Sequence, residues 1–176
     1  MGKTKRVVLL ALLVAMASSL HVVESQLPIP VPVPGVKLGL ANIISLLAIL
    51  LLGWQDAVYV AVARVVIGSL FSGSLLGPAF FMSMGGALAS IFIMVYICKK
   101  YKGVFSLAGV SLFGAAVHNT TQVILAAILV HSLGLLWYLP YLLIFAVPTG
   151  LFTGLAANYC LAKVPVKYGF KISNTD

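Results

Sequence analysis

The chain has 176 residues, of which 62% are hydrophobic and only 8% are charged, and its mean hydropathy is +1.15. A soluble domain of this composition would have too few polar side chains to cover its surface, so the composition indicates an integral membrane protein. The formal net charge of +8 does not indicate a nucleic-acid partner, because the Lys and Arg residues occur in short clusters at the ends of apolar runs.

The apolar runs predict helices that cross a membrane, because about 20 apolar residues span a bilayer in helical form. Continuous apolar character favours helices over the alternating strands of a membrane barrel. We therefore expect residues 1–176 to form a single all-α membrane domain, a bundle of six transmembrane helices. The expected helices are residues 7–23, 38–54, 57–71, 78–98, 105–130 and 137–162.

Residues 1–24 have two interpretations. They resemble a secretory signal, because Lys and Arg residues precede an apolar stretch and Ala15-Met16-Ala17 has the pattern of a cleavage site. The apolar run nevertheless continues to Val23 and is long enough to span a bilayer. We favour a retained first helix, and in this helix Ala11 and Ala15 form a pair of small residues spaced by four.

Residues 25–37 form the first outer loop, which has proline at every second position from Pro28 to Pro34. Proline fixes φ and removes the backbone donor, so this segment is expected to be extended and stiff. Two roles remain open for it. It is either a rigid connector on the membrane surface or a lid that folds over a cavity between the helices.

The basic residues predict the orientation, because loops rich in Lys and Arg stay in the cytoplasm. With six spans, three basic clusters fall on one side, so both termini are expected to be cytoplasmic. Residues 38–162 then form the other five helices, and residues 163–176 form a basic cytoplasmic tail. The clusters are Lys3, Lys5 and Arg6; Lys99, Lys100 and Lys102; and Lys163, Lys167 and Lys171.

Polar residues within the spans are the candidate binding residues, because a polar group in a membrane helix is costly unless it faces a cavity or another helix. Two of them in the fifth run, His118 and Gln122, are four residues apart and therefore share one helical face. The expected ligand is a small molecule that is anionic or has a polar head group. The residues predicted to bind it are Lys37, Asn42, Arg64, His118, Asn119 and Gln122.

Two of these residues have structural alternatives. Arg64 lies eight residues after Asp56, about 12 Å along a helix, which is too far for a direct ion pair. An interhelical carbonyl or the polar patch of the fifth run is its alternative partner. Lys37 either faces the ligand, or lies at the level of the lipid head groups, or pairs with Glu24 in the outer loop. The three histidines are scattered, so we expect no metal site and no cofactor.

The segment Pro34-Gly35-Val36-Lys37-Leu38-Gly39-Leu40-Ala41-Asn42-Ile43, together with Arg64-Val65-Val66-Ile67-Gly68-Ser69-Leu70 and His118-Asn119, resembles a bacterial family called Gx transporters. That family is also labelled heptaprenyl diphosphate synthase component I. It is similar to the substrate-binding subunits of energy-coupling factor transporters, which are six-helix uptake proteins. The resemblance implies that Ala11 and Ala15 dock a transmembrane scaffold subunit that works with ATPase subunits.

The sequence argues against catalysis by this chain alone. Prenyl synthases bind diphosphate through Mg²⁺ held by clustered aspartates. The three acidic residues are expected in an outer loop (Glu24), an inner turn (Asp56) and the tail (Asp176), so they do not form such a site. The leading hypothesis is a substrate-binding subunit of a small-molecule transporter in the cell membrane. The alternative is an anchor or interaction subunit of isoprenoid, quinone or flavin-linked electron-transfer machinery.

Overall fold

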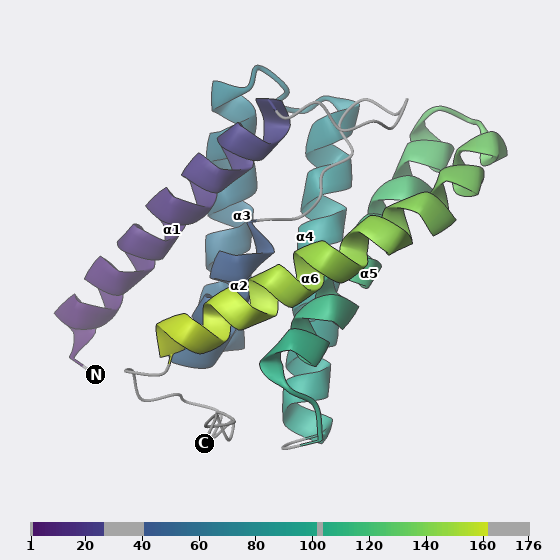
Figure 1. Cartoon of the computed structure of the whole chain (residues 1–176). Coiled ribbons are helices and arrows are strands. Elements are labelled where there is room, and N and C mark those ends of the chain that lie inside the picture. Colours follow the sequence, from purple (N-terminus) through teal and green to yellow (C-terminus); the bar gives the residue numbers. More distant parts are fainter. Residues whose placement is uncertain (1, 27–40, 102–103, 162–176) are drawn as a thin grey trace.

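The computed structural model describes residues 2–26, 41–101 and 104–161. Within these residues the chain is helical and has no strand, which confirms the expected all-α fold (Figure 1). Ser25 and Gln26, the first residues of the loop predicted at 25–37, belong to a helix, and the other residues of that segment lie outside the described ranges, as does the basic tail. The elements are α1 (Lys3–Gln26), α2 (Asn42–Leu51), α3 (Trp54–Phe71), α4 (Pro78–Lys100), α5 (Leu107–Leu129), the 3-10 helix η1 (Leu133–Tyr138) and α6 (Leu139–Leu161).

Five of the six helices are long and apolar enough to cross a membrane, α6 together with η1 being the longest of these segments. The exception is α2, which has 10 residues. At 1.5 Å per residue it extends about 15 Å, half of the thickness of a hydrocarbon core of about 30 Å. The second expected span is therefore present as a helix, but it is shorter than predicted.

The short helix α2 lies in the middle of the bundle, where it contacts α1, α3, α4, α5 and α6. Its side chains from Ile44 to Leu50 are all buried. The apolar side chains from which the sequence predicted a membrane span are therefore buried against other helices. Around α2, α1 packs on α3, while α5 packs along both α4 and α6, and α6 crosses the front of the bundle diagonally (Figure 1).

The helix directions bring basic residues from separate parts of the chain to one end of the molecule. The start of α1 and the end of α4, which carries Lys99 and Lys100, lie at the same end as the beginning of α3 (Figure 1). There Arg6 binds the buried Asp56 with two hydrogen bonds, from Nε to Oδ2 at 2.9 Å and from Nη2 to Oδ1 at 2.6 Å. This ion pair joins the first turn of α1 to the first turn of α3.

Glycine allows α5 and α6 to approach each other closely. A β-carbon at Gly150 would lie 2.7 Å from the α-carbon of Leu112, and one at Gly154 would lie 2.7 Å from the backbone nitrogen of Ala108. Both contacts are with the backbone of α5, which cannot turn aside as a side chain can. Small residues at this spacing are typical of closely packed membrane helices.

Candidate binding site

The bundle buries polar side chains from all six helices, although its surface is mainly apolar. Intramembrane polar residues are costly, so those that are buried need partners within the bundle or from a ligand. The buried polar residues other than Asp56 are Ser18, His21 and Glu24 of α1, Asn42 and Ser45 of α2, Arg64 and Ser69 of α3, Ser83 and Ser90 of α4, Ser111, His118, Asn119 and Gln122 of α5, and Thr153 of α6.

Arg64 and Asn42 are in direct contact. The guanidinium donates from Nη2 to Oδ1 of Asn42 at 3.1 Å, and both side chains are buried. The contact joins α3 to the first turn of α2. The sequence thus predicted both residues as parts of one site, whereas the expected partners of Arg64 were a carbonyl or the polar patch of the fifth run.

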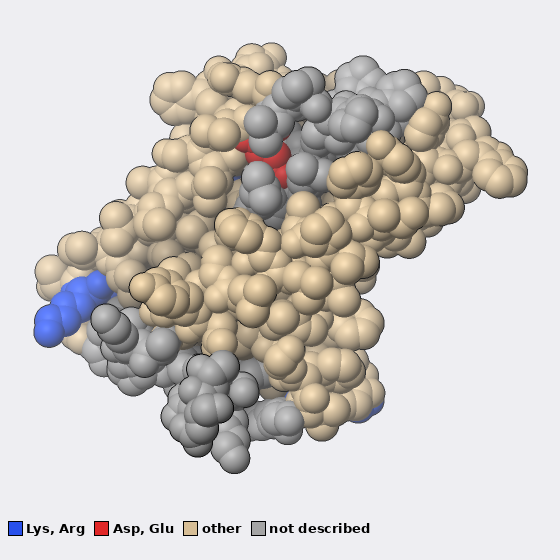
Figure 2. All heavy atoms as spheres, in the orientation of Figure 1, with Lys and Arg blue, Asp and Glu red and all other residues tan. Residues whose placement is uncertain are grey.

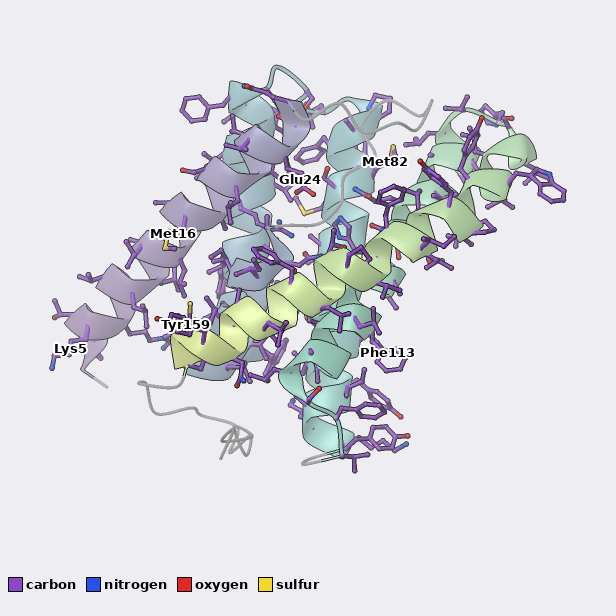
Figure 3. All side chains as sticks on the ribbon, in the orientation of Figure 1. Lys5, Met16, Glu24, Met82, Phe113 and Tyr159 are labelled. Atoms are coloured by element: carbon purple, nitrogen blue, oxygen red, sulfur yellow. The ribbon has the colours of Figure 1, made fainter. Side chains whose placement is uncertain are left out.

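Glu24 is the residue that the sequence analysis placed wrongly. It lies in the last turn of α1 rather than in an outer loop, only 2% of its surface is exposed, and it is on the side of α1 that faces the bundle (Figure 3). The helix continues past the end of the apolar run at Val23, because polar residues can extend a helix when their side chains face its buried side.

The ends of α1 differ in charge and in exposure. Basic side chains stand out at the start of α1, whereas acidic atoms are set among other atoms near its end (Figure 2). Ser18, His21 and Glu24 are spaced by three residues and so lie along one face of the helix, the face that is buried. This spacing was visible in the sequence and is the signal that would have identified Glu24 as an inward-facing residue.

The polar residues of α5 lie at two interfaces. His118 and Gln122 are on the shared face that was predicted, and both pack closely on Gly86 of α4: a β-carbon there would lie 3.0 Å from Nδ1 of His118 and 3.1 Å from Cγ of Gln122. Asn119 faces α6 and donates from Nδ2 to the carbonyl oxygen of Leu142 at 3.1 Å.

The two groups of predicted residues border the same element. Asn42 belongs to α2, and α2 contacts both α3, which carries Arg64, and α5, which carries the His118 group. Lys37, the remaining predicted residue, lies outside the described residues. Ala11 and Ala15, the predicted docking pair, lie on the exposed side of α1.

Several buried polar atoms have no hydrogen-bond partner among the described residues. Two of them are donors, Nε of Arg64 and Nδ2 of Asn42, and one is an acceptor, Oδ1 of Asn119. Five serine hydroxyl groups are also in this set, and a hydroxyl group can donate or accept. Most buried polar atoms in proteins are hydrogen-bonded, so these atoms need an explanation. The hydroxyl groups are those of Ser18, Ser45, Ser69, Ser83 and Ser90.

A metal site finds no support within the described part of the chain, where no group of three or more His, Cys, Asp or Glu residues is placed to hold an ion. The two described carboxylates are far apart in the bundle. Asp56 is in the first turn of α3 beside Arg6, and Glu24 is in the last turn of α1, at the opposite end of the α1–α3 pair.

The comparisons with known proteins concern the family rather than an individual relative. No curated protein and no solved structure matches the sequence. A family model described as heptaprenyl diphosphate synthase component I matches residues 13–160, a region that begins within α1 and ends within α6. Because this match covers most of the chain and includes the described polar residues, the protein, a multi-pass membrane protein, belongs to the heptaprenyl diphosphate synthase component I family.

Proposed function

We propose that the protein is the ligand-binding membrane subunit of a small-molecule transporter of the energy-coupling factor type, located in the cell membrane. One observation carries the proposal: buried polar atoms on α2, α3, α4 and α5 have no hydrogen-bond partner among the described residues. In a bilayer such atoms are costly. A small molecule with a polar head group would supply hydrogen-bond partners for these atoms, and the atoms would in turn recognise that molecule.

The position of these atoms fits capture from the outer side. Asn42 is in the first turn of α2, and Arg64 lies past the midpoint of α3, in the half that is remote from the basic end of the bundle. The basic end is predicted to be cytoplasmic. A ligand bound by Asn42 and Arg64 would therefore lie in the outer half of the membrane.

The exposed face of α1 supports the second part of the proposal, a scaffold partner. Ala11 and Ala15 are exposed one turn apart, and small residues at this spacing let a second helix approach closely. The sequence contains no phosphate-binding loop of the Gly-x-x-x-x-Gly-Lys-Ser/Thr type. Energy for transport would accordingly come from separate ATPase subunits.

The family description favours a second candidate function, a membrane component of a heptaprenyl diphosphate synthase that acts with another component. We propose that this chain alone does not elongate prenyl chains. The Mg²⁺ used in such reactions needs several oxygen ligands close together, whereas Glu24 and Asp56 are at opposite ends of the α1–α3 pair. Prenyl elongation by the purified chain with Mg²⁺ would contradict this.

The test of the transporter proposal is co-purification. We expect the full-length protein, isolated from membranes in lipid nanodiscs, to retain a small molecule that mass spectrometry detects in near-equal amount. The variant Ser45→Ala removes a buried hydroxyl without a described partner, so it should reduce retention about threefold to tenfold, the equivalent of one hydrogen bond.

Thr120→Ala is the matched control, because this hydroxyl is only half-buried and already donates to the carbonyl oxygen of Ala116 in its own helix at 2.8 Å. It should retain as much of the molecule as the wild type does. A wild-type protein that retains nothing, but co-purifies with a prenyl-elongating component, would favour the synthase function instead.

A further inference from the structure

The hydrogen bond between Arg64 and Asn42 leaves an unpaired donor on each of the two side chains. Nη2 of Arg64 donates to Oδ1 of Asn42 at 3.1 Å, whereas Nε of Arg64 and Nδ2 of Asn42 have no hydrogen-bond partner among the described residues. Nε adjoins Nη2 within the guanidinium, and Nδ2 adjoins Oδ1 within the amide, so the two unpaired donors flank one hydrogen bond. Both side chains are buried, with only 2% and 3% of their surface exposed.

The contact also fixes which end of the amide is unpaired. Because Nη2 is a donor, it requires the oxygen of Asn42 opposite it, and the amide nitrogen is the end that remains. A guanidinium has donors only. The two side chains therefore require acceptor atoms from a ligand, and they would repel a ligand group that presents an N–H or O–H donor to them.

The ion pair of Arg6 shows which group completes an arginine edge in this protein. Nε and Nη2 of Arg6 donate to the two carboxylate oxygens of Asp56. In Arg64, Nη2 has the uncharged oxygen of Asn42 and Nε has no described partner. Hydrogen bonds from a guanidinium to an anionic oxygen are about twice as strong as those between neutral groups. The comparison favours an anionic group with at least two oxygen atoms beside Arg64.

The cost of burying Arg64 points to the same class of ligand. A cation at membrane depth is costly unless its surroundings compensate it. Asp56 is the acidic residue of α3, but it lies at the basic end of the bundle and binds Arg6 there. An anionic ligand would bring the compensating charge with it, so its contacts would both hold the ligand and stabilise the bundle.

We propose that Nε of Arg64 and Nδ2 of Asn42 bind an anionic oxygen group, a carboxylate or a phosphate, and that the transported ligand carries this group. The inference rests on the proposed ligand-binding function, and it selects the anionic alternative from the ligands predicted by the sequence. Asn42 begins α2, and Arg64 lies in the half of α3 that is remote from the basic end. The anionic group of the ligand would therefore lie in the outer half of the membrane.

The variant Asn42→Asp tests whether the site lacks a negative charge. It keeps an acceptor for Nη2 and replaces the unpaired Nδ2 donor by an anionic oxygen, so that it can bind Arg64 as Asp56 binds Arg6. The full-length protein is compared in nanodiscs after the retained molecule has been removed by detergent exchange. We expect Asn42→Asp to melt about 3–5 °C above the wild type.

The opposite result would overturn the inference. A variant that melts no higher than the wild type, or does not fold, would mean that the charge of Arg64 is already neutralised inside the protein, for example by Glu24. An added carboxylate would then be a second, uncompensated charge in the bundle.

Inorganic phosphate and acetate are the probes for the bound group. Melting of the ligand-free protein is measured with each anion at millimolar concentration and with sodium chloride of equal ionic strength. We expect a specific rise of about 3–5 °C for the wild type, and the anion that gives the larger rise identifies a phosphate or a carboxylate on the ligand. Asn42→Asp should lose the response, because its own carboxylate occupies the donors. No specific rise for the wild type, or an undiminished rise for Asn42→Asp, overturns the inference.

Lys100→Gln is the matched control for charge. It also lowers the net charge by one, but it removes an exposed cation at the end of α4, where Nζ donates to the hydroxyl oxygen of Tyr96 at 2.8 Å. It should respond to the anions as the wild type does. If it loses the response as completely as Asn42→Asp, the response reflects the overall charge of the protein and the inference fails.

The identity of the retained molecule separates the two proposals. If the wild type retains a small molecule that has neither a carboxylate nor a phosphate, the transporter proposal stands and the anion inference fails. If the wild type retains nothing, although it shows the anion response that Asn42→Asp loses, the anion site is real and the transporter proposal fails.

Discussion

Arg64 is the largest of the fully buried side chains, and the oxygen of Asn42 is the hydrogen-bond acceptor that the structure gives it. We predict that Asn42→Leu, which has a similar size, destabilises the protein by about 1.5–3 kcal/mol, the value of a hydrogen bond to a charged group. Thermal or denaturant unfolding in detergent measures this loss. Ser45→Ala, one turn along α2, should leave stability unchanged or raise it, because its hydroxyl has no described partner. Equal losses for both variants would contradict the importance of the Arg64 contact.

The helices α5 and α6 approach each other closely where Gly154 faces the backbone of α5. We predict that Gly154→Ala separates these helices and costs about 1–3 kcal/mol, because a β-carbon would lie 2.7 Å from the backbone nitrogen of Ala108 and 2.8 Å from the carbonyl oxygen of Leu107. The melting temperature should fall accordingly.

Gly109→Ala is the matched control for this prediction. It lies on α5 near the same contact, but its β-carbon would be 3.5 Å from the nearest atom, in the ring of Phe105. Alanine is also a better helix former than glycine, so this variant should be as stable as the wild type or more stable by up to about 1 kcal/mol. If both variants melt alike, close packing of α5 on α6 does not limit stability.

At the scale of the whole molecule, the ends of the bundle differ in a way that can be measured in cells. The ion pair of Arg6 with Asp56 and the lysines at the end of α4 lie at one end, which is predicted to be cytoplasmic. With Cys98 and Cys160 replaced by alanine, Ser132→Cys should react with a membrane-impermeant maleimide added to intact cells, because it follows α5 at the opposite end. Lys100→Cys should react only after the membrane is opened. The reverse pattern would overturn the predicted orientation.

The length of the mature chain is a second whole-molecule prediction. Cleavage after Ala17 would remove Arg6 and leave the buried carboxylate of Asp56 without its partner, which is unfavourable. We therefore predict that intact-mass spectrometry of the purified protein gives a chain that keeps α1. A mass that begins at Ser18 would contradict this and would leave a five-helix protein.

The membrane class, the all-α fold and the positions of the long helices followed from the sequence alone. These properties depend on local composition, because an apolar run of sufficient length satisfies its backbone only as a helix in a bilayer. The polar residues Asn42, Arg64, His118, Asn119 and Gln122 were recognisable for the same reason: each is costly within an apolar run. All five are buried in the structure.

Only the tertiary structure decided which buried polar and charged residues are partners of one another. Arg64 bonds Asn42, which is 22 residues away, and Arg6 bonds Asp56, which is 50 residues away. His21 of α1 contacts Gly68 of α3, which is 47 residues away, and nothing in the sequence showed that these two helices pack on each other. The shortness of α2 was likewise hidden, because a helix buried among other helices and a helix facing lipid need the same apolar side chains.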